Sequence, residues 1–171
     1  AAAFAAIVFT QPYRLDRITV FLKPGHDLQG IGYQLHQSLI ALGSGGFWGK
    51  GFGMSRQKFN YLPEAAGDSI FAIFGEEFGF FGAVILIVLF LAFFWRGIRV
   101  ARHAPDMFGR YLATGLTLLI IIQAFINMAA ISGLVPLTGL PLSFISFGSS
   151  ALVINLVEVG ILMNISKYIR V

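Results

Sequence analysis

One stretch of this chain limits its fold more than any other: from Phe78 to Phe94 the sequence carries no charged residue. Residues 70–95, which contain this stretch, are long enough to cross the hydrocarbon core of a bilayer as a helix, which takes about 20 apolar residues. Trp95 stands at the end of the stretch, where the aromatic belt of a membrane protein is expected. We therefore expect an all-α integral membrane protein with a transmembrane helix at residues 70–95.

Composition agrees with a membrane protein and excludes several other classes. Charged residues make up 12% of the chain, whereas soluble domains contain about 25%. The chain has no cysteine, which excludes disulfides and cysteine-based metal sites. The net charge of +4 comes from basic residues at the ends of segments, so it suits anionic lipid headgroups and not nucleic acid. No Walker, GxSxG, HExxH or dinucleotide motif is present in the sequence.

Two further apolar stretches predict transmembrane helices at residues 111–132 and 144–166, joined by an uncharged turn at residues 133–143. The loop at residues 96–110 is rich in arginine, and the tail at residues 167–171 is basic and has no acid. Because cytoplasmic loops are enriched in Lys and Arg, we place this loop and this tail in the cytoplasm. The turn then lies on the opposite, extracytoplasmic side.

The first part of the chain is polar and rich in glycine. Residues 1–10 are apolar but too short to cross a bilayer, and we interpret them as the end of a transmembrane helix, the alternative being a short peripheral helix. Residues 11–69 are expected to form a large extracytoplasmic loop, because their glycines and prolines exclude one long helix. Within this loop, residues 14–22 and 33–42 are candidates for short amphipathic helices on the membrane surface.

Asp68 is our leading candidate for a catalytic residue. It stands directly before the first full span, in the sequence Gly67-Asp68-Ser69. A carboxylate there suits a general base or, together with Glu64, a ligand of a divalent cation such as Mg²⁺ or Mn²⁺. The alternatives are a helix N-cap for Asp68 and a solvated or salt-bridged carboxylate for Glu64.

Basic residues of the same loop form a second group of candidates. Lys50, Arg56 and Lys58 are expected to contact substrate phosphates, since Lys and Arg bind anionic oxygens well. The alternative for these three residues is a solvated loop surface.

Polar residues inside the predicted spans form a third group, because charges in a membrane are costly and usually mark a cavity, a partner or a function. These membrane-cavity candidates are Glu76, Glu77, Gln123, Asn127 and Glu158. The alternative for Glu76 and Glu77 is a pair near the interface that snorkels and pairs with Lys or Arg. For Gln123 and Asn127, which share a helix face, the alternative is interhelical hydrogen bonding. Glu158 is expected to need a partner or a proton.

Ordered motifs run along the chain from about Pro12 to Ser166. They include Gly43-Ser44-Gly45-Gly46, Ser55-Arg56-Gln57-Lys58, Tyr61-Leu62-Pro63-Glu64, Glu76-Glu77-Phe78-Gly79, Gln123-Ala124-Phe125-Ile126-Asn127 and Gly133-Leu134-Val135-Pro136-Leu137-Thr138-Gly139. These motifs resemble those of the SEDS proteins (shape, elongation, division and sporulation). The Tyr33-Gln34 and Ser55-Arg56-Gln57-Lys58 stretches are more similar to the division member of that family than to the elongation member.

The resemblance implies a fold and a function. It implies a ten-helix protein of the bacterial inner membrane, of which this chain matches the C-terminal part, and which polymerises lipid II into glycan strands during septal cell-wall synthesis. The family's catalytic aspartate falls on Asp68, where it helps to deprotonate the acceptor sugar hydroxyl, alone or with a divalent cation. The implied partners are lipid II, a class B penicillin-binding protein, other membrane proteins of the division complex, and membrane lipids.

The sequence departs from the family pattern at some positions. Ala66 and Gly67 stand where the family commonly has His-Thr, so no role of that histidine carries over to this chain. Glu158 stands where the family is normally apolar. A second hypothesis, from another functional class, is a non-catalytic transporter of a lipid-linked precursor, or a scaffold for the penicillin-binding protein, with Glu76, Glu77 and Glu158 as cavity groups. Under the first hypothesis, we expect residues 1–171 alone to be inactive.

Overall fold

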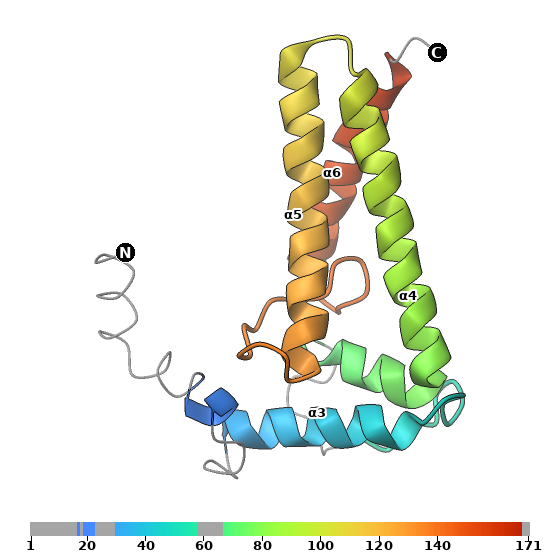
Figure 1. Ribbon diagram of the computed structural model, residues 1–171, viewed down its shortest axis with the longest axis vertical. Coiled ribbons are helices and arrows are strands. Elements are labelled where there is room, and N and C mark those ends of the chain that lie inside the picture. Colours follow the sequence, from blue (N-terminus) through green and yellow to red (C-terminus); the bar gives the residue numbers. More distant parts are fainter. Residues whose placement is uncertain (1–16, 18, 23–29, 58–66, 169–171) are drawn as a thin grey trace.

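The computed structural model describes residues 17, 19–22, 30–57 and 67–168. These residues form helices and connecting turns, and no strand occurs among them, as the sequence predicts. The helices labelled in Figure 1 are α3 (Ile31–Gly45), α4 (Ile70–His103), α5 (Met107–Ile131) and α6 (Ser149–Lys167). The long parts of α4, α5 and α6 extend in one direction, and α3 crosses one end of them (Figure 1).

Three of these helices suit a bilayer. Within the described residues, α4, α5 and α6 are long and apolar enough to cross a membrane. In helix α6 the polar residues are distributed as in many membrane helices, because Asn155 and Glu158 are among its buried residues. Between its polar ends, α6 exposes large apolar side chains: Leu152, Val153, Ile154, Leu156, Val157 and Met163. Lipid tails and the apolar faces of neighbouring membrane helices both suit such an exposed face, whereas the buried polar residues of α6 face the other described helices.

Helix α4 is longer than predicted, because it continues past Trp95 to His103. The expected loop at residues 96–110 is therefore largely helical. Arginine is a good helix former, and the first residue that opposes the helix is Pro105. Proline disfavours the helical conformation of the residue before it, and Ala104 accordingly has extended dihedral angles (φ −60°, ψ 137°).

Helices α5 and α6 also begin away from their predicted positions. Helix α5 begins earlier, at Met107, because Asp106 is its N-cap and accepts a hydrogen bond at Oδ2 from the N–H of Gly109 at 2.7 Å. Helix α6 begins later, at Ser149, because the segment before it forms a turn instead of a helix. Phe144 in that turn has φ 67°, outside the helical region.

The N-terminal predictions are covered in part by the described residues. Helix α3 contains the whole of the amphipathic helix predicted at residues 33–42. In the segment predicted at residues 14–22, Arg17 and residues 19–22 are helical. The transmembrane segment predicted at residues 1–10 lies outside the described residues.

Gly79 divides α4 into two arms. Its dihedral angles (φ 66°, ψ −164°) are not helical, and a residue with a side chain rarely adopts a positive φ of this kind. The first arm, residues 70–78, runs across the end of α5 beside α3, whereas the second arm, residues 80–103, runs along the bundle (Figure 1). The bend therefore places the start of α4 next to α3.

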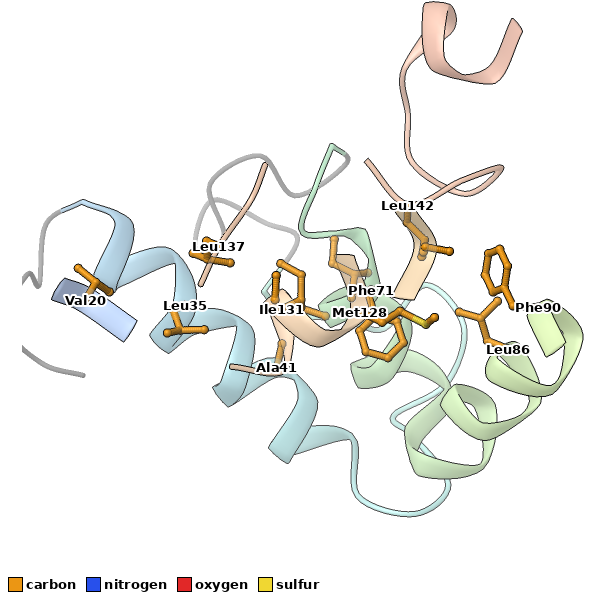
Figure 2. Packing of buried hydrophobic residues seen from close by; sticks show 14 residues of the cluster. Val20, Leu35, Ala41, Phe71, Leu86, Phe90, Met128, Ile131, Leu137 and Leu142 are labelled. Atoms are coloured by element: carbon orange, nitrogen blue, oxygen red, sulfur yellow. The ribbon is translucent and has the colours of Figure 1, made fainter. Parts of the chain in front are cut away.

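The main hydrophobic core lies at this crossing of α3 with the bundle. Leu35 of α3, Phe71 of α4 and Ile131 of α5 are all buried in it. Figure 2 shows that Leu137 and Leu142, from the segment between α5 and α6, pack into the same core. Because one core contacts all these elements, it fixes the loops that join them at this end of the molecule.

Candidate functional site

Asp68 lies half-buried in the turn before α4, at the same end of the molecule as the main core. The N-cap position of α4 is occupied by Ser69 and not by Asp68. Three parts of the chain that are distant in sequence approach Asp68: α3, α5 and the turn around Gly139. The candidate site is therefore built by the fold and not by one local motif.

Gln34 of α3 holds the side chain of Asp68. Its Nε2 atom donates to Oδ1 of Asp68 at 3.1 Å and to Oγ of Ser69 at 2.9 Å. The hydroxyl of Ser69 lies 3.4 Å from the same carboxylate oxygen. An amide that donates to a carboxylate stabilises its ionised form and restricts its orientation. Gln34 therefore fixes which way the carboxylate of Asp68 faces.

Two amides of α5 hold the backbone of the site. Nδ2 of Asn127 donates to the carbonyl oxygen of Asp68 at 2.7 Å and to that of Leu140 at 2.6 Å. One turn earlier on α5, Nε2 of Gln123 donates to the carbonyl oxygen of Pro141 at 3.0 Å. The two amides thus make hydrogen bonds, as the alternative interpretation expects, but their partners are loop carbonyls and not another helix.

The guanidinium of Arg17 and the carboxylate of Asp68 lie near the same glycine, Gly139. Nη1 of Arg17 donates to the carbonyl oxygen of Leu137 at 2.9 Å. A Cβ atom added to Gly139 would lie 3.3 Å from Nη2 of Arg17 and 3.7 Å from Oδ2 of Asp68. Guanidinium and carboxylate therefore face the same glycine, whose φ of 69° also favours glycine.

Sequence reasoning missed Arg17, Gln34 and Gly139 as parts of the site. Arg17 lies in the segment 14–22 that the sequence predicts as amphipathic, and no spacing in the sequence indicates that it lies near residue 139. Gln34 and Gly139 occur in the motifs that carry the family resemblance, which was the one signal that could have found them.

No group of three or more His, Cys, Asp or Glu side chains comes together within the part of the chain that the structure describes. An amide N–H of Gln34 and the hydroxyl of Ser69 contact the carboxylate of Asp68, and the guanidinium of Arg17 lies at the neighbouring Gly139. Glu64, the second predicted metal ligand, and Lys58, a predicted phosphate contact, lie outside the described residues.

Glu76 is the centre of a second polar cluster. Its carboxylate is fully buried and forms an ion pair with Nζ of Lys50 at 2.6 Å. It also accepts hydrogen bonds from Oγ of Ser55 at 2.5 Å and from the backbone N–H groups of Arg56 and Gln57, each at 3.3 Å. A buried charge persists when it is paired and hydrogen-bonded in this way. Lys50, a predicted phosphate contact, is therefore engaged with Glu76.

Neighbouring residues extend this cluster. Oε1 of Glu77 accepts a hydrogen bond from the backbone N–H of Ser55 at 3.4 Å. Arg56 contributes its backbone to the cluster and is exposed. Glu76 and Glu77 together fasten residues 50–57 to the first arm of α4.

Glu158 lies apart from both groups, on α6. It is buried with Asn155 and Leu162 on the face of α6 that packs into the bundle. Within the described residues, its Oε2 atom has no hydrogen-bond partner. The expectation that Glu158 needs a partner or a proton is in keeping with this position.

The sequence matches known proteins along its whole length. The family model of the FtsW/RodA/SpoVE proteins, described as "Cell cycle protein", matches residues 1–171. Stage V sporulation protein E of Bacillus subtilis (strain 168) is 48% identical over 169 residues, which are 99% of this chain and 46% of that protein. A probable peptidoglycan glycosyltransferase FtsW of Geobacter sp. (strain M18) is 49% identical over 164 residues, 96% of this chain and 45% of that protein.

The chain spans about half the length of the curated relatives it matches. A solved structure described as "Structural coordination of polymerization and crosslinking by a peptidoglycan synthase complex" contains a similar chain. The TM-score is 0.70 at 24% sequence identity, with coverage of 96% of this chain and 46% of that chain. This likeness shows the fold, which is that of part of a helical bundle with several membrane-spanning helices.

Proposed function

Because the chain belongs to the FtsW/RodA/SpoVE family of cell cycle proteins, we propose that the full-length protein is a peptidoglycan glycosyltransferase. It polymerises lipid II into glycan strands during septal cell-wall synthesis. Relatives that are named probable peptidoglycan glycosyltransferase support this proposal, at 49% identity for one of them. The family is that of multi-pass membrane proteins, in keeping with the three membrane-type helices described above.

The position of Asp68 is the observation that carries the proposal. In the reaction, Asp68 accepts the proton of the acceptor sugar hydroxyl as general base. The hydroxyl oxygen forms a bond to the anomeric carbon of the donor, while the bond from that carbon to the diphosphate breaks and undecaprenyl pyrophosphate leaves. Gln34 orients the carboxylate through a hydrogen bond of 3.1 Å, and the guanidinium of Arg17 lies at the same glycine as the carboxylate.

The proposal includes a location and partners. The protein lies in the bacterial cytoplasmic membrane, with the Asp68 end of the bundle outside the cytoplasm and the arginine-rich end of α4 inside. Its partner is a class B penicillin-binding protein, which supplies the transpeptidase, together with other membrane proteins of the division complex. The similar chain in a peptidoglycan synthase complex supports the partner assignment.

The test is lipid II polymerisation by the full-length protein, purified with its class B penicillin-binding protein. We expect polymer from the wild type and a loss of about a hundredfold or more in Asp68→Asn, because general base catalysis is typically worth that much. Asp106→Asn is the matched control, since Asn is as good an N-cap as Asp, and it should retain wild-type activity. Each protein is assayed with and without Mg²⁺ or Mn²⁺, which tests for a divalent cation.

The transporter or scaffold alternative gives a different pattern. If Asp68→Asn polymerises lipid II like the wild type, Asp68 is not the catalytic base. If, in addition, Glu76→Gln and Glu158→Gln abolish function in the cell, the buried carboxylates and not Asp68 carry the function. Polymer from neither wild type nor variant would leave the alternative in place.

A further inference from the structure

Residues 46–54, which we name the aromatic loop, present large apolar side chains to the outside. Phe47 is 68% exposed, Trp48 82%, Phe52 83% and Met54 67%. Single exposed apolar residues are common on soluble proteins, but a contiguous group marks a surface that something other than water covers.

The aromatic rings of the loop contact phenylalanines at the bend of α4. The ring pairs and their centroid separations are Trp48–Phe81 at 4.9 Å, Phe47–Phe80 at 6.1 Å and Phe52–Phe78 at 6.0 Å. Beyond the bend, α4 continues with further exposed apolar residues, among them Ile85 at 60% and Leu89 at 61%. The aromatic loop is therefore continuous with an exposed apolar face of α4, a helix long and apolar enough to cross a membrane.

The backbone holds the aromatic loop in place. At the bend, the N–H groups of Lys50 and Gly51 donate to the carbonyl oxygens of Glu76 and Glu77, each at 3.0 Å. In return, the carbonyl oxygens of residues 46 and 47 accept from the N–H groups of residues 80 and 81, at 2.9 and 3.2 Å. These bonds replace those that the helix loses at Gly79, so the exposed rings sit on a fixed support.

The aromatic loop carries little charge on its outer surface. Its one charged residue is Lys50, whose ammonium group is turned toward the buried carboxylate of Glu76. Aromatic side chains without competing charges are enriched where the headgroups of a bilayer meet the acyl chains. A water-facing surface or a polar protein partner would not favour this composition.

We propose that the aromatic loop is a membrane-interface anchor, with Trp48 and Phe52 seated at the boundary between lipid headgroups and acyl chains. The anchor fixes the height of α3 and of the first arm of α4 relative to the bilayer. The occupant of the surface is lipid, because the surface is aromatic, carries little charge and continues an exposed apolar face of a membrane-type helix. This inference is independent of the reaction proposed above.

The test is the depth of spin labels in the full-length protein, reconstituted into vesicles of phosphatidylethanolamine and phosphatidylglycerol. The chain has no cysteine, so Trp48→Cys and Phe52→Cys give single labels once any cysteine outside residues 1–171 is replaced. His36→Cys, exposed on α3, is the aqueous reference, and Leu89→Cys, exposed on α4, is the acyl-chain reference. Collision rates with oxygen and with a water-soluble nickel chelate are measured for each label.

We expect the labels at 48 and 52 to collide more often with oxygen, and less often with the nickel chelate, than the label at position 36. The same ratio of collision rates should place them at a shallower depth than the label at position 89. Labels that behave like position 36 would overturn the anchor. Labels shielded from both reagents would also overturn it, because a protein surface would then cover the loop.

A second measurement keeps the native ring. Trp48 fluorescence, taken as the difference between wild type and Trp48→Phe, should be quenched by lipids brominated near the headgroup. Lipids brominated deep in the acyl chain should quench it less, and the absence of quenching by either lipid would contradict the proposal.

Discussion

At the scale of single residues, the two oxygens of Asp68 lie in different surroundings. Oδ1 accepts from Gln34, whereas Oδ2 lies near Gly139 and the guanidinium of Arg17. A carboxylate with two distinct sides presents a defined orientation to a substrate, which a general base needs. The contact with Gln34 is the part of this arrangement that a substitution can remove most cleanly.

We predict that Gln34→Met lowers the turnover number for lipid II polymerisation by about tenfold or more, because a hydrogen bond to a charged group contributes roughly 1.5–3 kcal/mol. Methionine keeps the length of the side chain and removes the donor. Gln37→Met, which changes another glutamine of α3, is the control and should polymerise like the wild type. Equal losses in both variants would mean that α3 is disturbed in general and that Gln34 has no special role.

Asp68 itself is predictable from the sequence, since a carboxylate directly before an apolar span stands out locally. Its neighbours are not, because Arg17 and Gln34 reach it only after α3 has folded across the bundle. Glu158 is a different case. Its burial is expected from its place in an apolar span, but in the structure it joins neither the Asp68 site nor the cluster around Glu76.

At the scale of elements, the ion pair of Lys50 with Glu76 joins a loop to a helix arm. Glu76 is fully buried, and its partners come from residues 44–57. The loop thereby gains a fixed place on the first arm of α4, next to the bend at Gly79. The ion pair and the hydrogen bonds of Glu76 therefore stabilise the position of the aromatic loop on α4.

We predict that Lys50→Met destabilises the full-length protein by about 3 kcal/mol, because it leaves a carboxylate buried without its cation. The estimate is at the low end of the usual range, since Ser55 and two backbone N–H groups still donate to Glu76. Unfolding in detergent micelles measures the change. Arg56→Met, at an exposed position, should change stability by less than about 0.5 kcal/mol. A similar stability for both variants would show that the ion pair contributes little.

The spans were predictable from hydropathy, whereas their ends and the bend were not. The end of α4 depends on Pro105 and not on the arginines, which hydropathy treats as a stop although they favour a helix. The bend at Gly79 depends on hydrogen bonds with residues 46–51, which lie far away in sequence. The local periodicity of the sequence does not indicate a contact between residues so far apart.

At the scale of the whole molecule, the described helices form part of a larger bundle. The chain spans about half the length of its curated relatives, and α6 exposes an apolar face along most of its length. Three membrane helices do not enclose a cavity that shields a reaction from its surroundings.

We therefore predict that residues 1–171, purified alone, do not polymerise lipid II, whereas the full-length protein with its penicillin-binding protein does. Gel analysis of the glycan products measures both. Polymer from residues 1–171 would contradict the prediction and would place all catalytic groups within this chain.

The bend in α4 has a consequence for how a substrate arrives. Because α4 bends at Gly79, Asp68 at the start of the first arm lies beside α5, whose Asn127 donates to its carbonyl oxygen, and not on the axis of the second arm. Under the proposed function, the lipid-tailed substrate approaches by lateral diffusion in the leaflet, so its encounter rate depends on surface density and not on bulk concentration. Polymerisation rates should accordingly scale with the mole fraction of lipid II in the bilayer and stay constant when the vesicles are diluted in buffer.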